Sequence, residues 1–231
     1  MQSSQFIASV ALFAVTAAQQ QVSFPLRPKL DGEYIDLYLH QTTWSDMSVE
    51  ENSDGNAVIN MYDRDRGYIS TSPTPDPYSY FKPNLLGGYV TYDINISDLP
   101  CGCITALYQV LMPAKQEDGS LFERHYWYCG AQQSKYGGEL CPEFDIMEAN
   151  QWGLHTTAHP CEAPSDLGHY TACDFQGQCV VDIEDEGALE RYGPGPEFDI
   201  NTLETFNVRL DYHDFEGHFV GYTTTLTQGD Q

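Results

Sequence analysis

The chain has 231 residues, which is enough for a single domain with a substantial hydrophobic core. It carries 34 acidic residues (Asp and Glu) against 10 basic residues (Lys and Arg), giving a formal net charge of −24. Nucleic acids and anionic membranes are bound through basic surfaces, so this charge argues against both as partners. The 16 Tyr, 11 Phe and 19 Gly residues favour β-structure over helix.

The N-terminus contains a short apolar run, from Phe6 to Ala18, that ends in small residues. Val15-Thr16-Ala17 resembles a signal-peptidase site, and the run is too short to span a bilayer. We therefore predict a signal peptide over residues 1–18, a single domain over residues 19–231, and a secreted, extracellular, monomeric protein. A buried N-terminal segment is the alternative interpretation of the same run.

All seven cysteines lie between positions 101 and 179. In a secreted protein this pattern predicts up to three disulfides and one unpaired thiol, with the connectivity left open. A zinc site is the alternative, but the sequence has no Cys-x-x-Cys pair, and we expect neither a metal nor a cofactor. One N-glycosylation sequon, Asn95-Ile96-Ser97, predicts a glycan on Asn95.

Short runs in which apolar and polar residues alternate predict strands along the chain. In the first third these runs are residues 34–40 and 57–62, and a proline-rich loop follows over residues 70–84. From Tyr89 onward, the apolar residues at positions 90, 92, 94 and 96 alternate with polar ones. This pattern predicts a strand with one buried face.

The remaining runs also indicate strands. Residues 106–112 form a more continuously apolar run, which is compatible with a central strand, and residues 206–212 alternate. Phe215-Glu216-Gly217 then predicts a turn into a further strand over residues 218–226. Because no segment has a long helical period, we predict an all-β fold of two packed antiparallel sheets.

Three carboxylates alternate with apolar residues in the segment 143–150. Glu143 and Asp145 point to the same face of a strand, but strict alternation sends Glu148 to the opposite face. One extra residue, a β-bulge around Ile146–Met147, would return Glu148 to the first face. The segment therefore predicts either three clustered carboxylates or, without the bulge, the acidic outer face of an amphipathic strand.

With the bulge, Glu143 and Glu148 lie roughly 13 Å apart along the strand. Side chains that lean toward one another shorten this gap to roughly 5–6 Å, close to the ~5–5.5 Å between the two carboxyl groups of a retaining glycosidase. In such enzymes one carboxylate attacks the sugar and the other protonates the leaving oxygen. Asp145, which lies between them, is expected to hydrogen-bond Glu143 and hold its charge.

The segment 143–150, followed by Thr157-Ala158-His159-Pro160-Cys161, resembles the active-site strand of glycoside hydrolase family 7, the cellobiohydrolases and endoglucanases. The similarity extends in the same order from about Gly87 to Tyr222. It includes Asp98-Leu99-Pro100-Cys101-Gly102 upstream and Tyr192-Gly193-Pro194-Gly195 downstream. The related laminarinase-like family 16 shares a similar motif and is the alternative.

The resemblance implies a β-jelly-roll sandwich with a concave cleft, and retaining hydrolysis of β-1,4-glucosidic bonds in cellulose or a related β-glucan. By position it implies Glu143 as the nucleophile, Asp145 as its supporting residue and Glu148 as the general acid/base. It also places His159 near the cleaved sugar. A packed or surface role is the alternative for His159.

Three further residues align with family positions that contact sugar: Tyr108, Tyr128 and Gln132. For the two tyrosines, packing in the core is the alternative. His155 and His159 are spaced as a metal-binding pair on a helix, but the neighbouring Thr and Pro residues disfavour a helix.

The chain also departs from the family pattern. Met147 replaces the usual Trp, segment 128–133 lacks one cysteine and one acid, and the family's product-binding arginines cannot be placed between Cys161 and Tyr192. The family's catalytic domain is longer than this chain, which indicates a short or C-terminally truncated member. Two functions are expected: an endo-acting β-1,4-glucanase with an open cleft, or a non-catalytic glucan-binding protein on the same scaffold.

Overall fold

The computed structural model describes residues 23–41, 47–53, 57–61, 66–99 and 102–229. The predicted signal peptide, residues 1–18, lies outside these ranges. The chain divides into two compact units, Met1–Thr74 and Pro75–Gln231, and each is described by itself. A single domain over residues 19–231 stays a prediction.

The first unit consists of short antiparallel strands. A three-stranded sheet has the order β1-β4-β7 and contains β1 (Ser23–Leu26), β4 (Leu37–Gln41) and β7 (Gly67–Ser70). Two ribbons pair β2 (Lys29–Leu30) with β3 (Glu33–Tyr34) and β5 (Ser48–Glu51) with β6 (Ala57–Asn60). The predicted strands at residues 34–40 and 57–62 therefore correspond to β3 and β4, and to β6.

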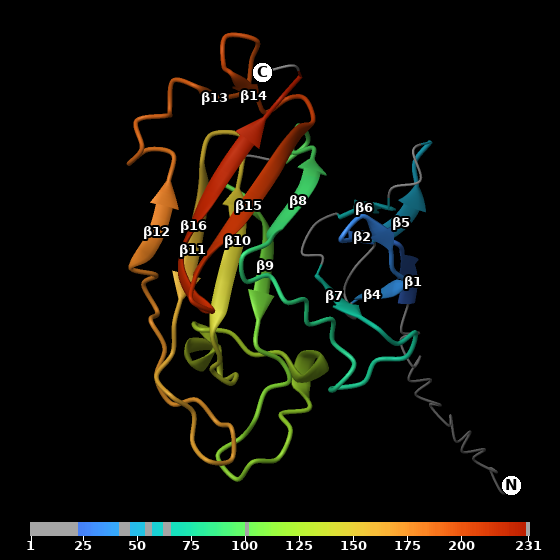
Figure 1. Cartoon of the computed structure of the whole chain (residues 1–231), viewed down its shortest axis with the longest axis vertical. Helices are drawn as coiled ribbons and strands as arrows, with labels where there is room; N and C mark the ends of the chain where they lie inside the picture. Colours follow the sequence, from blue (N-terminus) through green and yellow to red (C-terminus); the bar gives the residue numbers. More distant parts are fainter. Residues whose placement is uncertain (1–22, 42–46, 54–56, 62–65, 100–101, 230–231) are drawn as a thin grey trace, which may run out of the picture. The chain divides into compact units, whose positions relative to one another are not determined.

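The second unit is built on two antiparallel sheets. One has the order β12-β11-β10-β9 and contains β9 (Thr105–Val110), β10 (Glu143–Ala149), β11 (Leu154–His159) and β12 (Cys179–Asp182). The other has the order β16-β15-β8 and contains β8 (Tyr89–Ile94), β15 (Phe206–Phe215) and β16 (His218–Thr227). Figure 1 shows the red β15–β16 hairpin lying across the yellow β10. The predicted all-β antiparallel sandwich is confirmed.

Smaller elements connect these sheets. β13 (Tyr192–Gly193) and β14 (Ile200–Asn201) form a parallel pair, and the 3-10 helices η1 (Arg124–Trp127) and η2 (Gln133–Tyr136) lie between β9 and β10. Within the described ranges, no helix has the length and apolar character needed to cross a membrane.

The strand predictions for this unit hold in part. Burial alternates along β8 and along the first seven residues of β15, as their apolar patterns predict. Glu216 and Gly217 both have positive φ, 54° and 81°, which matches a two-residue hairpin turn between β15 and β16. The central position expected for residues 106–112 is wrong among the described strands, because β9 lies at the sheet edge. Its residues are all half-buried, so its apolar run does not reflect a central strand.

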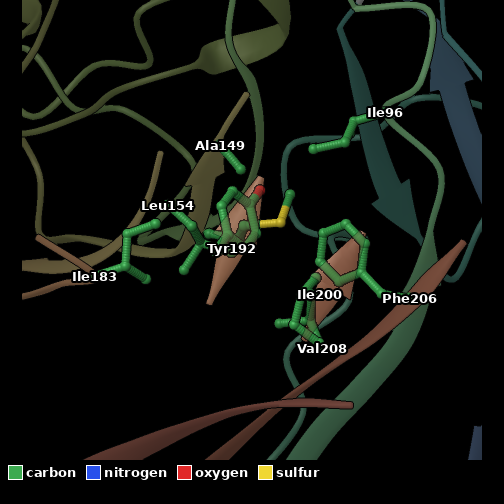
Figure 2. Close-up of a cluster of buried hydrophobic side chains, with 9 residues drawn as sticks. Ile96, Ala149, Leu154, Ile183, Tyr192, Ile200, Phe206 and Val208 are labelled. Carbon is green, nitrogen blue, oxygen red and sulfur yellow. The ribbon is translucent and has the colours of Figure 1, made fainter. Parts of the chain in front are cut away.

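The two sheets are joined by a buried apolar core. One cluster combines Met147 and Ala149 of β10 with Phe206 and Val208 of β15, and Figure 2 shows how Ala149, Phe206 and Val208 lie within it. A second cluster combines Ile146 with Leu210 and other apolar side chains. Every apolar residue of β10 from Ile146 onward therefore faces the core, and this leaves the acidic residues for the opposite face.

Two disulfides close loops of this unit, Cys129–Cys141 and Cys161–Cys173. Cys103 and Cys179 are free and exposed, and Cys101 lies outside the described residues. Asn95 of the sequon is exposed, as attachment of a glycan requires. Glycosylation of Asn95 stays a prediction.

Two phenylalanines of β15 should respond differently to truncation. Phe206 is 1% exposed and Phe215 is 65% exposed. Phe206→Ala should lower the free energy of unfolding by about 3–5 kcal/mol, because it leaves a cavity between the sheets. Phe215→Ala should change it by no more than about 0.5 kcal/mol. Urea denaturation followed by circular dichroism measures both, and equal losses would contradict the assignment of the core.

Candidate active site

A β-bulge in β10 determines which side chains share a face. Against β11, the register passes from Asp145↔Thr157 to Glu148↔His155, so three steps on β10 match two steps on β11. Against β9, it passes from Asp145↔Tyr108 to Met147↔Leu107. Since the core clusters contain both Ile146 and Met147, the extra residue turns Glu148 back to the face of Glu143 and Asp145. The predicted bulge around Ile146–Met147 is confirmed.

Two histidines of β11 lie on the same face as these carboxylates. His159 is directly opposite Glu143, and His155 is directly opposite Glu148. Residues directly opposite one another in an antiparallel pair project to the same side of the sheet. The site therefore combines three carboxylates of one strand with two imidazoles of the next.

Glu143 is held by the loop between the disulfide partners Cys129 and Cys141. Its Oε2 accepts the Ala131 backbone N–H at 2.7 Å, and a Cβ on Gly130 would lie 2.9 Å from the same oxygen. The lack of a side chain on Gly130 thus allows the loop to approach the carboxylate. Burial, and secondly the negative charge of Asp145, raise the pKa of Glu143 to about 6.

Asp145 is buried and paired with His159. The two groups approach to 3.1 Å between Oδ2 and Nε2, and the His159 Nδ1–H donates to the Asp174 carbonyl oxygen at 2.7 Å. The hydrogen bond to Asp145 raises the pKa of His159 to about 9, so the ring is an imidazolium at neutral pH. The expected hydrogen bond from Asp145 to Glu143 is replaced by this ion pair, since two carboxylates repel one another unless one is protonated.

Glu148 has a different partner. Its Oε2 lies 2.8 Å from His155 Nε2, and His155 Nδ1 lies 3.9 Å from Asp182 Oδ2 on β12. The hydrogen bond to His155 lowers the pKa of Glu148, and the same bond raises the pKa of His155. At any pH between the lowered pKa of Glu148 and the raised pKa of His155, Glu148 is therefore a carboxylate and His155 an imidazolium.

The three predicted sugar-contacting residues lie close to the same strand. Tyr108 of β9 is directly opposite Asp145, and its ring meets the Tyr128 ring edge-on, with the centroids 6.3 Å apart. Tyr128 is buried, and its hydroxyl oxygen would lie 3.1 Å from a Cβ on Gly130. Gln132 follows in the same loop and donates from Nε2 to the Phe175 carbonyl oxygen at 3.1 Å. Tyr108 is thus opposite Asp145, Tyr128 packs against Tyr108, and Gln132 follows the residue that binds Glu143. The contact of all three with sugar stays a proposal.

Sequence reasoning did not identify the loop that orients His159. The Asp174 carboxylate accepts the backbone N–H groups of residues 176, 177 and 178, and this turn presents the Asp174 carbonyl to the imidazole. Gly177 has φ +69°, and a Cβ there would lie 2.7 Å from His159 Cε1. The Asp-x-x-Gly spacing is a turn signal in the sequence, but nothing in it names the histidine as the partner.

Metal binding through His155 and His159 is not what the structure favours. The two residues lie on a strand, and each imidazole is paired with a different carboxylate. Across the part of the chain that is described, no group of three or more His, Cys, Asp or Glu side chains is arranged to hold a metal ion.

The contact at Gly177 can be tested against a matched glycine. Gly187 has nearly the same φ, +68°, but a Cβ there would meet nothing within 4 Å. Both Gly177→Ala and Gly187→Ala carry a backbone cost of about 1–2 kcal/mol. Only Gly177→Ala should also push the turn, and with it the Asp174 carbonyl, away from His159, so the pKa of His159, measured by NMR, should fall below about 9. An unchanged His159 titration in Gly177→Ala would contradict this packing.

Curated relatives share the sequence over much of its length. The chain is 28% identical over 194 residues to the endo-beta-1,4-glucanase celB of Emericella nidulans, covering 70% of this chain and 45% of that protein. It is 29% identical over 181 residues to endoglucanase EG-1 of Hypocrea jecorina, covering 70% of this chain and 37% of that protein. The chain thus spans less than half the length of these curated relatives. No protein-family model matches it.

Solved structures share its fold. An endoglucanase I complexed with cellobiose superposes with a TM-score of 0.65 at 17% identity, covering 94% of this chain and 72% of that one. A family 7 cellobiohydrolase from Daphnia pulex superposes with a TM-score of 0.61 at 17% identity, covering 92% and 70%. At this identity the superpositions establish the fold alone. The chain is therefore similar in sequence to curated endoglucanases, at 28–29% identity, and shares its fold with an endoglucanase and a family 7 cellobiohydrolase.

Proposed function

We propose that this chain is a secreted, retaining glycoside hydrolase that cleaves β-1,4-glucosidic bonds in cellulose or a related β-glucan. The observation that carries the proposal is the placement of Glu143, Asp145 and Glu148 on one face of β10. Similarity to proteins named endo-β-1,4-glucanases and endoglucanases supports the reaction class. The fold shared with an endoglucanase I that was solved with cellobiose supports the class of ligand.

The chemistry is a double displacement. Glu143, oriented by the Ala131 N–H, attacks the anomeric carbon while Glu148 protonates the leaving oxygen. Water, deprotonated by Glu148, then releases the sugar from Glu143. The protonated His159 compensates the charge of Asp145, so that Glu143 can still ionise beside a second carboxylate.

The mode of attack on the polymer is proposed to be endo. The segment between Cys161 and Tyr192 is shorter than in the family pattern, and a processive tunnel needs long loops to cover it. Tyr108, Tyr128 and Gln132 are proposed to contact the sugar on either side of the carboxylates. No cofactor is needed, because acid, base and nucleophile are all carboxyl groups.

A non-catalytic glucan-binding protein is the second candidate. One observation favours it: Glu148, the proposed acid, is held as a carboxylate by His155 in the resting structure. Binding to glucan without the release of reducing sugar would support this candidate over the hydrolase.

Hydrolysis of soluble mixed-linkage β-glucan tests the proposal. The purified mature chain should release reducing sugar, and Glu143→Gln should lower kcat by about a thousandfold or more because it removes the nucleophile. Glu148→Gln should lower it by about 10²–10⁴-fold because it removes the proton donor. Glu162→Gln, an exposed glutamate on the loop after β11, is the matched control and should keep full activity. A folded chain that binds glucan without cleaving it would reject the hydrolase.

The pH dependence follows from the ionisation of Glu143. The nucleophile must be a carboxylate, and its pKa is raised from 4.5 to about 6. The ionised fraction therefore increases as the pH rises through about 6, and kcat/KM should rise with pH to that point. A rising limb centred near 4.5 in the steady-state profile would mean that Glu143 is not in the buried, charge-crowded setting described above.

A further inference from the structure

A row of three ionisable groups crosses β10, β11 and β12. His155 is directly opposite Glu148 on one side and directly opposite Asp182 on the other. Its Nε2 lies 2.8 Å from Glu148 Oε2, and its Nδ1 lies 3.9 Å from Asp182 Oδ2. Asp182 is itself fixed, because its Oδ1 accepts the Glu184 N–H at 2.7 Å. Each nitrogen of the imidazole therefore faces a different carboxylate.

Stability alone explains this row poorly. The side chains of His155, Glu148 and Asp182 are 38%, 26% and 35% exposed. Ion pairs with this much access to solvent contribute little to the free energy of folding. The Asp145–His159 pair, by contrast, is buried and bonded to the loop at Asp174. The row of His155, Glu148 and Asp182 is instead partly open to solvent.

The charges facing the row determine where its proton lies. Glu148 faces His155 and, more distantly, His159 on β11, while its neighbour on β9 is the uncharged Ala106. His155 faces Glu148 and Asp145 on β10 and Asp182 on β12. The surroundings lower the pKa of Glu148 and raise that of His155, so the pair keeps one proton, and that proton lies on the imidazole.

A general acid needs a proton at the start of the reaction, and Glu148 by itself does not hold one. We propose that His155 is a positioning residue that stores the proton which Glu148 delivers to the leaving oxygen. This inference rests on the proposed function. It resolves the conflict between an acid role for Glu148 and its ionised resting state.

The transfer balances in both halves of the reaction. As Glu143 forms its bond to the anomeric carbon, the glycosidic C–O bond breaks and its electron pair remains on the leaving oxygen. That oxygen takes a proton through Glu148, which receives the proton from His155 Nε2 across the 2.8 Å contact. In the second half, the oxygen of water bonds to the anomeric carbon, and Glu143 leaves as a carboxylate. The one proton that water loses passes through Glu148 back to His155.

The test compares His155→Gln with the wild type on two substrates: mixed-linkage glucan and dinitrophenyl cellobioside, whose leaving group needs no proton. On glucan, His155→Gln should lower kcat by about 10–100-fold with KM changed by no more than about twofold. Its falling alkaline limb should move to lower pH, because the carboxyl must then hold the proton unaided. On dinitrophenyl cellobioside its activity should stay near that of the wild type.

Two further variants complete the test. Asp182→Asn should shift the alkaline limb in the same direction but by less. It removes a negative charge that stabilises the His155 imidazolium, and it leaves the contact between His155 and Glu148 intact. His213→Gln is the control, since His213 is exposed and hydrogen-bonded to Thr223 at 2.7 Å on the other sheet.

Three outcomes would overturn the inference. The first is an equal loss on both substrates, the second an unmoved alkaline limb in a folded His155→Gln protein, and the third a rise in KM alone. A wild type inactive on both substrates would instead reject the proposed function, and the inference with it.

Discussion

The candidate site depends on one extra residue in β10. A strand alternates strictly between its two faces, so without the bulge at Ile146–Met147 the carboxylate of Glu148 would point into the core and an apolar side chain would take its place. The core fixes the bulge in turn, because it accepts both Ile146 and Met147. Packing between the sheets therefore brings the proposed nucleophile and the proposed acid to one face.

Three carboxylates on one face repel one another, and two histidines of β11 reduce this repulsion. His159 and His155 lie opposite the two ends of the acidic run, and each pairs with one carboxylate. The inner pair is buried and tied to a loop, which makes it a fixed part of the site. The outer pair is partly exposed, and its 2.8 Å contact is the one proposed to carry the proton. Glu143, left with a backbone N–H as its donor, keeps a raised pKa.

Sequence alone predicted the parts of this arrangement that follow from a two-residue period. The alternation at Tyr89–Ile94 and Phe206–Tyr212, and the bulge that Glu148 needs, all express the burial of one sheet face. The sequence did not predict which group pairs with each carboxylate. Ala131 and Asp174 reach the site from loops, whose paths leave no periodic trace in the sequence. His155 was weighed only as a helical metal ligand, because its cross-strand partner depends on register.

Covalent trapping of the nucleophile tests the central claim most directly. A fluorinated cellobioside with a good leaving group should form a stable glycosyl-enzyme, since fluorine beside the anomeric carbon slows the second displacement. Proteolysis and mass spectrometry then locate the modified residue. We predict one label per chain, on Glu143, and protection from labelling by cellobiose. A label on Glu148 would contradict the assigned roles, and a folded chain that remains unlabelled would contradict the double displacement itself.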